Sequence, residues 1–379
     1  MNPRLKTALK ILSIFGLLYV FLASISLMGA SFKLFGKGFA KQLITSCSNP
    51  FAGLFIGILA TSVIQSSSTT TSLVVALAGG GVLPLTFAVP IIMGANIGTS
   101  VTNTIVSLTF ITRKEDFRRA FAAATVHDFF NLLTVALFFP LECRFYLIQR
   151  AALWLTRIFA GAGGVKFTSP LKAIIKPAVH SIKHGLTETF GLPHVAAGVI
   201  MLVGAVVLLI LSLTYLVKTM RSLIIAKAEG VIDRYLFRND FVALLLGICI
   251  TVLVQSSSVT TSLLVPLVAA GILTLRRAYP FTLGANIGTT CTAILASLAT
   301  ITVAKEGGAV NTVGVTAAFA HLMFNLFGIA VFYPLRRIPI LLATKLADLA
   351  SGSKKWVAVY IVPVFFLLPL FTILIFRNF

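Results

Sequence analysis

The residues best suited to chemistry lie in a short polar motif that occurs twice. Gln65-Ser66-Ser67-Ser68 recurs as Gln255-Ser256-Ser257-Ser258, an offset of 255 − 65 = 190 residues. Residues 51–112 and 241–275, which contain the two motifs, include no charged residue and no histidine. Hydroxyl and amide oxygens suit a hard cation such as sodium, whereas the N–H groups at a helix N-terminus suit an anion. The motifs therefore indicate the binding of small ions.

A second polar motif follows each copy of the first at the same offset. Gly94-Ala95-Asn96-Ile97-Gly98-Thr99 recurs as Gly284-Ala285-Asn286-Ile287-Gly288-Thr289, and residues 61–110 align with residues 251–300 without a gap. Of these 50 aligned positions, 25 are identical. Further along, the register shifts by four residues, so that Asn131 matches Asn325 (325 − 131 = 194). Identity at this level indicates an internal duplication.

The composition places these motifs in a membrane protein. Of the 379 residues, 58% are hydrophobic and only 11% are charged, less than half the share that soluble domains carry. The formal net charge is +21, which is also typical of nucleic-acid-binding proteins. Here the basic residues cluster between long apolar runs, so we interpret them as cytoplasmic flanks of membrane helices and predict no nucleic-acid partner.

Both halves are predicted to follow one plan of helices. A spanning helix opens each half, two short apolar helices flank the Gln-Ser-Ser-Ser motif, a longer segment carries the second motif, and a last span follows. The short helices lack the roughly 20 residues that cross a bilayer, so we expect re-entrant hairpins. The glycines and asparagine of the longer segment predict an unwound or broken helix. The expected ranges are 11–32, 51–64, 69–83, 85–110 and 120–139, then 194–217, 241–254, 259–275, 278–303 and 313–333.

Loop charges predict that the two halves have opposite orientations. The loop after the broken segment carries four basic residues in the first half but only Lys305 in the second, and the loop after the first helix shows the reverse bias. The expected fold is an all-α polytopic membrane protein with two inverted-topology repeats, re-entrant helical hairpins, broken helices and a cytoplasmic N-terminus. Its expected parts are a first repeat (1–143), a connecting segment (144–193), a second repeat (194–335) and a C-terminal segment with an additional apolar helix (336–379). The placement of the connecting and C-terminal segments stays open.

One carboxylate is expected within the membrane. Asp128 is the only acidic residue between Asp116 and Glu142, and it lies in the middle of an apolar segment. An intramembrane carboxylate is a functional candidate by default, although Asp128 could also be a structural residue bonded to His127. Two threonine pairs spaced three residues apart on one helix face could equally serve as sodium ligands or pack between helices. They are Thr99 with Thr102 and Thr289 with Thr292.

These motifs, together with Thr125-Val126-His127-Asp128-Phe129-Phe130-Asn131, resemble the type II sodium-phosphate cotransporter family. The resemblance covers most of residues 50–140 and 240–335. It implies a secondary transporter, not an enzyme, that imports inorganic phosphate by alternating access, with sodium bound alongside and no cofactor. It also implies that a carboxylate such as Asp128 accompanies an additional sodium ion and electrogenic transport. The short loop at 142–193 suits a bacterial member located in the inner (plasma) membrane.

The motifs and the resemblance together assign candidate ligands. Phosphate is expected to contact the hairpin hydroxyls and two asparagine amides: Ser66, Ser67, Ser68, Ser256, Ser257, Ser258, Asn96 and Asn286. Sodium, the only metal ion expected, would be bound by Gln65, Thr99, Thr102, Asp128, Gln255, Thr289 and Thr292. The chain has Ala285 where the family has a serine, which removes one side-chain oxygen from a sodium site.

Three other functions remain open from the residues alone. A carrier of a different oxyanion would need the same polar turns. An intramembrane hydrolase could use the serines with His127 and Asp128, but the sequence has no Gly-x-Ser-x-Gly, Ser-x-x-Lys or His-Glu-x-x-His motif. An ion channel would favour like-oriented pore loops or a ring of subunits, whereas inverted halves suit a carrier. The oligomeric state, the stoichiometry and the affinity are not predicted.

Overall fold

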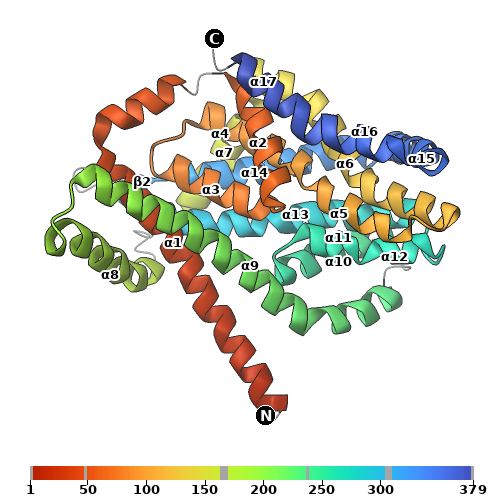
Figure 1. Cartoon of the computed structure of the whole chain (residues 1–379), viewed down its shortest axis with the longest axis horizontal. Coiled ribbons are helices and arrows are strands. Elements are labelled where there is room, and N and C mark those ends of the chain that lie inside the picture. Colours follow the sequence, from red (N-terminus) through yellow and green to blue (C-terminus); the bar gives the residue numbers. More distant parts are fainter. Residues whose placement is uncertain (1–2, 47–48, 163–169, 236–238, 304–309, 377–379) are drawn as a thin grey trace.

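The computed structural model of the chain describes residues 3–46, 49–162, 170–235, 239–303 and 310–376 (Figure 1). Within these residues, seven helices are long and apolar enough to cross a membrane. They span Leu5–Phe35, Leu85–Phe110, Lys114–Phe145, His194–Leu223, Leu275–Thr300, Val313–Phe332 and Lys355–Phe376. The only strands in the described parts are Thr302–Val303 (β1) and Val310–Asn311 (β2), which pair antiparallel. The predicted all-α polytopic membrane fold is therefore confirmed.

Equivalent helices occur in the same order in both halves. The first half contains α1 (Pro3–Ser46), α2 (Pro50–Ile64), α3 (Ser67–Gly79), α4 (Leu85–Gly98), α5 (Ser100–Ser107) and α6 (Lys114–Phe145). The second contains α9 (His194–Tyr235), α10 (Asp240–Val254), α11 (Ser257–Ser262), α12 (Leu264–Ala269), α13 (Leu275–Thr300) and α14 (Val313–Phe332). Helices α7 (Leu147–Ala162) and α8 (Pro170–His184) connect the halves. Helices α1 and α9 extend beyond the expected spans and pack along each other (Figure 1).

Glycines let two pairs of helices approach until their backbones touch. A Cβ atom on Gly94 of α4 would lie 1.9 Å from the carbonyl oxygen of Leu54 on α2. The equivalent Gly284 of α13 would place its Cβ 2.0 Å from the carbonyl oxygen of Leu244 on α10. Small residues at such crossings replace side-chain contacts with direct backbone packing, as is common between membrane helices. The glycines therefore serve the contact between each hairpin and the helix that follows it.

The predicted helix breaks are not present as unwound segments. Thr99 lies between α4 and α5 but keeps helical backbone angles (φ −61°, ψ −24°), so Leu85–Phe110 forms one spanning helix, and α13 continues from Leu275 to Thr300. The expectation of broken helices over residues 85–110 and 278–303 was wrong, because their glycines permit close packing without unwinding the backbone. Leu263, between α11 and α12, also keeps helical backbone angles. Pro266 lies just beyond and has no N–H to donate to the preceding turn.

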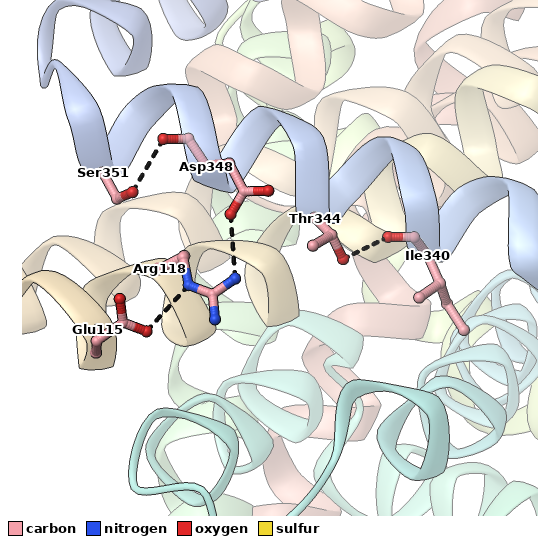
Figure 2. A network of polar contacts seen from close by, with 6 residues as sticks. All are labelled: Glu115, Arg118, Ile340, Thr344, Asp348 and Ser351. Carbon is pink, nitrogen blue, oxygen red and sulfur yellow. Dashed lines mark hydrogen bonds and ion pairs between the residues drawn. The ribbon is translucent and has the colours of Figure 1, made fainter.

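The C-terminal segment packs against the first half. It contains α15 (Arg337–Gly352), α16 (Lys355–Val362), a π-helical turn (Pro363–Leu367) and α17 (Leu368–Phe376). Figure 2 shows Arg118 of α6 between two carboxylates, with its Nε 3.1 Å from Glu115 Oε2 and its Nη1 3.1 Å from Asp348 Oδ1 of α15. At the other end, Phe376 of α17 stacks on Phe51 of α2 with ring centroids 5.9 Å apart. These contacts show where the C-terminal segment packs, a position that the sequence did not predict.

Candidate ion and substrate site

The two Gln-Ser-Ser-Ser motifs form turns with the same backbone geometry. Gln65 and Gln255 end α2 and α10 in the left-handed conformation, each with φ of 59°. The next residue is extended and accepts a hydrogen bond from the helix that begins there: Ser66 Oγ from the Thr69 N–H at 3.2 Å, and Ser256 Oγ from the Val259 N–H at 3.3 Å. Each turn therefore reverses the chain and starts a helix whose first N–H groups lack intrahelical acceptors.

The two turns lie against each other, although 187 positions separate the residues that touch. Ser68 Oγ donates to the backbone carbonyl of Gln255 across 3.5 Å. A few residues away, Asn103 Nδ2 donates to Thr261 Oγ1 at 2.7 Å, which joins α5 of the first half to α11 of the second. Ser67, Ser68, Ser257 and Ser258 are all buried. The fold thus brings the predicted phosphate-binding serines of both halves into one region.

Each glutamine is held by a threonine at the equivalent position of its own half. Thr102 Oγ1 donates to Gln65 Oε1 at 2.9 Å, and Thr292 Oγ1 donates to Gln255 Oε1 at 2.9 Å. The Gln255–Thr292 pair is buried, whereas Gln65 is exposed. Four of the predicted sodium ligands therefore occur as two matched pairs, with amide and hydroxyl oxygens already together.

The remaining two threonines turn toward their own helices. Thr99 Oγ1 donates to the carbonyl of Ala95 at 3.1 Å, and Thr289 Oγ1 donates to the carbonyl of Ala285 at 3.0 Å. Both are buried, and each hydroxyl oxygen keeps its lone pairs for a further ligand. Thr99 lies where α4 meets α5, with helical backbone angles. Their role as sodium ligands stays a prediction.

The predicted phosphate ligands Asn96 and Asn286 belong to a buried network that joins the two halves. Asn96 Oδ1 lies 3.1 Å from His321 Nε2, and the equivalent Asn286 Oδ1 bonds to His127 Nε2. Each asparagine is thus paired with the histidine of the opposite half, an arrangement that we call the asparagine–histidine clasp. The clasp is completed by Asn131, whose Nδ2 donates to the carbonyl of Asn96 at 3.0 Å, and by Asn325, whose Nδ2 donates to that of Asn286 at 3.4 Å. The amide oxygens of both asparagines bond within the clasp, while Asn96 Nδ2 donates to the Ile92 carbonyl of its own helix at 2.9 Å and Asn286 Nδ2 donates to Asn131 Oδ1 at 3.1 Å. Neither side chain bonds to the serine turns.

Asp128 is buried and has a partner that the sequence did not reveal. Its Oδ2 accepts a hydrogen bond of 2.9 Å from the hydroxyl of Tyr360 on α16, while Oδ1 has no hydrogen-bond partner. The buried Ser100 hydroxyl lies beside this carboxylate, within reach of a hydrogen bond to it. A carboxylate oxygen beside a hydroxyl is a suitable pair of ligands for a cation. His127, the alternative partner, bonds to Asn286.

Sequence reasoning missed three groups of residues near the site. Tyr360 stacks on Phe129 at 6.4 Å and is the only tyrosine after residue 333, a signal that could have singled it out. Ser100 follows the second motif directly. Thr61 and Thr251 are identical in the two halves at the offset of 190, and both hydroxyls are buried without a hydrogen-bond partner. The alignment of the two repeats could have singled out Thr61 and Thr251, because they are identical in it.

Comparison with known proteins agrees with the motifs. Residues 20–166 and 208–336 match the family described as Na+/Pi-cotransporter. Over 431 aligned residues the chain is 35% identical to sodium-dependent phosphate transport protein 2A of Rattus norvegicus, an alignment that covers 95% of this chain and 67% of the relative. It is 33% identical over 450 residues to sodium-dependent phosphate transport protein 2B of Homo sapiens, covering 95% and 64%. The chain thus spans about two thirds of the length of these relatives. No solved structure gives a significant match.

Proposed function

Because the chain belongs to the Na+/Pi-cotransporter family, we propose that it imports inorganic phosphate together with sodium and binds both where the two Gln-Ser-Ser-Ser turns meet. The protein is a transporter and not an enzyme. The observation that supports this site most directly is the contact of Ser68 with the Gln255 carbonyl, which joins the two turns. Sodium enters as a co-transported ion, and no other cofactor is needed.

The chemistry of phosphate explains why sodium must bind with it. Phosphate is a mixture of monoanion and dianion at neutral pH, and moving up to two negative charges into a low-dielectric site without compensation is prohibitively costly. Residues 51–112 and 241–275 contain no lysine or arginine. A helix N-terminus contributes only about half a charge, so the starts of α3 and α11 offset roughly one unit. Bound sodium supplies the rest of the positive charge.

Within this proposal the serines hold phosphate and three oxygen-rich groups hold sodium. The Gln65–Thr102 and Gln255–Thr292 pairs offer amide and hydroxyl oxygens beside the turns. Asp128, with Ser100 nearby, offers the only carboxylate. Asn96 and Asn286 act through the clasp, where they hold the two halves together around the site, and contact phosphate only if a clasp bond opens.

The arrangement of the halves favours alternating access. We propose that the two halves are inverted repeats, that their hairpins re-enter the membrane, and that they rock against each other about the shared site. The loop charges favour a cytoplasmic N-terminus, and the short connecting segment suits the plasma membrane of a bacterium.

Transport into proteoliposomes tests this proposal. An inward sodium gradient should drive radiolabelled phosphate to an internal concentration above the external one, and choline in place of sodium should abolish it. Calorimetry in detergent, where no gradient exists, should show tighter phosphate binding in sodium than in choline. Equal affinity in both salts would contradict the charge argument. Flux that only equalises phosphate would identify a channel, and stronger competition by another oxyanion would identify a different substrate.

A further inference from the structure

A second cavity lies away from the serine turns. It has a volume of about 700 Å³ and opens between α1, α8, the end of α3 and the end of α13. Most of its lining carries no polar side-chain atom, including Ile25, Ala30, Ala76, Ile175 and Val179. Helix α8, which forms one wall, runs beside α1 and α9 at the edge of the molecule (Figure 1).

The rim of this cavity is basic. Lys176, His180 and Lys183 line it from α8 at spacings of four and three residues, so they project from one helix face. Lys33 of α1 joins them. Among the described residues that line the cavity none is acidic, and all four basic side chains are exposed to solvent. The cavity therefore combines an apolar interior with a positively charged edge.

The cavity is separate from the proposed transport site. It meets α3 at Gly79 and Gly80, whereas the serine turn lies at the other end of that helix, beside Ser67. Twelve residues of α-helix correspond to about 18 Å. A phosphate ion bound here would also leave the apolar interior unfilled, because a small anion offers nothing to pack against it.

We propose that this cavity binds an anionic phospholipid, with the headgroup phosphate at Lys33, Lys176 and Lys183 and an acyl chain against the apolar wall. Basic residues beside membrane helices attract anionic lipids, and apolar lining favours a hydrocarbon chain. Free phosphate shares the headgroup chemistry but not the chain. Both ligands would therefore place a phosphate group at the lysines. Only a phospholipid would also place an acyl chain in the apolar interior, so the effect of filling that interior distinguishes the two.

Glycines provide a matched pair of variants that test the acyl site. A Cβ atom on Gly29 of α1, which lines the cavity, would meet no atom within 4 Å, so the side chain of Gly29→Leu begins in open space at the cavity wall. Gly16 of the same helix is equally open but does not line the cavity, so Gly16→Leu is the control. In choline buffer, short-chain phosphatidylglycerol should raise the melting temperature of the parent and of Gly16→Leu, and should leave Gly29→Leu unchanged.

Removing charge tests the headgroup site without filling the cavity. The double change Lys176→Gln/Lys183→Gln should weaken the apparent affinity for phosphatidylglycerol about thirtyfold, from the contribution that each lysine makes near an anionic lipid. Lys345→Gln/Lys355→Gln removes the same charge elsewhere and should not. Three results would overturn the lipid proposal: equal stabilisation by phosphatidylcholine, stabilisation by inorganic phosphate that Lys176→Gln/Lys183→Gln weakens as much as it weakens phosphatidylglycerol binding, or no effect of any lipid on the parent. None of these measurements depends on phosphate transport.

Discussion

The two halves of this protein share their scaffold and differ in their ion chemistry. The serine turns, the glutamine–threonine pairs and the asparagine–histidine clasp occur in both halves at equivalent positions. Asp128 does not: the equivalent residue of the second half is Leu322, beside His321 (322 − 128 = 194). The hydroxyl of Tyr360, in the C-terminal segment, donates to the Asp128 carboxylate. Under the proposed function, the shared elements close around one anion site and the unique carboxylate adds a cation on one side only.

The surroundings of Asp128 show the same division. The hydroxyl of Ser100, on the first-half helix Leu85–Phe110, lies near this carboxylate. Four predictions separate the properties that the two halves share from those that differ between them.

The largest effect is expected where the halves are most alike. Gly94→Ala and Gly284→Ala would each place a Cβ about 2 Å from a backbone oxygen of the facing helix, so both helix pairs must separate. We expect each change to destabilise the protein by about 1–3 kcal/mol or more. Thermal unfolding in detergent measures this loss.

The control for these variants is Gly16→Ala, which adds a Cβ in open space and removes an unfavourable helix residue. It should unfold at or above the parent temperature. A destabilised Gly94→Ala beside an unaffected Gly284→Ala would show that the two crossings are not equivalent.

The second prediction concerns the residue that distinguishes the halves. Asp128→Asn and Asp128→Leu should leave phosphate transport measurable but reduce the charge moved in each cycle. One elementary charge crossing the membrane responds to potential by about 2.3 kcal/mol per 100 mV. Potassium-diffusion potentials imposed on proteoliposomes measure this dependence. If both variants respond to potential as the parent does, Asp128 is a structural residue.

The sequence predicted much of the helical scaffold but few of the contacts between the two halves. The hairpin turns follow from a polar motif within helices too short to span, and the structure places Gln65 and Gln255 at those turns. The glutamine–threonine pairs also follow a local pattern repeated at 190 residues. The exchange of clasp partners between halves could not be predicted, because it depends on how the halves face each other and not on either alone.

The two errors have different physical causes. Glycine both weakens a helix and lets another backbone approach, and the sequence does not say which property is used. In α13 the second property prevails, so the expected break is absent. Tyr360 was missed because its apolar neighbours indicate only a lipid-facing helix, and its value comes from a carboxylate 232 positions away.

The third prediction tests the shared anion site. Ser67→Ala and Ser257→Ala remove equivalent buried hydroxyls, and each should weaken phosphate binding by about 1–3 kcal/mol if a buried acceptor loses its donor. Because the turns have the same backbone geometry, we expect similar losses. Ser212→Ala, a buried serine of α9 that bonds within its own helix, is the control. Normal phosphate affinity in both turn variants would remove the serines from the site.

The smallest expected effect sharpens the difference between the halves. Tyr360→Phe keeps the ring that stacks on Phe129 and removes only the hydroxyl that donates to Asp128 Oδ2. Loss of this hydrogen bond frees the carboxylate to rotate, so the sodium concentration needed for half-maximal uptake should rise about fivefold, the equivalent of about 1 kcal/mol. The phosphate affinity at saturating sodium should not change.

Tyr333→Phe is the matched control, since it removes a hydroxyl that donates to Asp240 Oδ2 at 3.1 Å, outside the proposed site. The decisive measurement is the double change Tyr360→Phe/Asp128→Asn. If Tyr360 acts by positioning Asp128, its removal should have no further effect on sodium dependence once the carboxylate is gone, because the two residues then form one coupled unit. Independent, additive effects would mean that Tyr360 only packs α16 against the first half. The asymmetry between the halves would then lie in Asp128 alone.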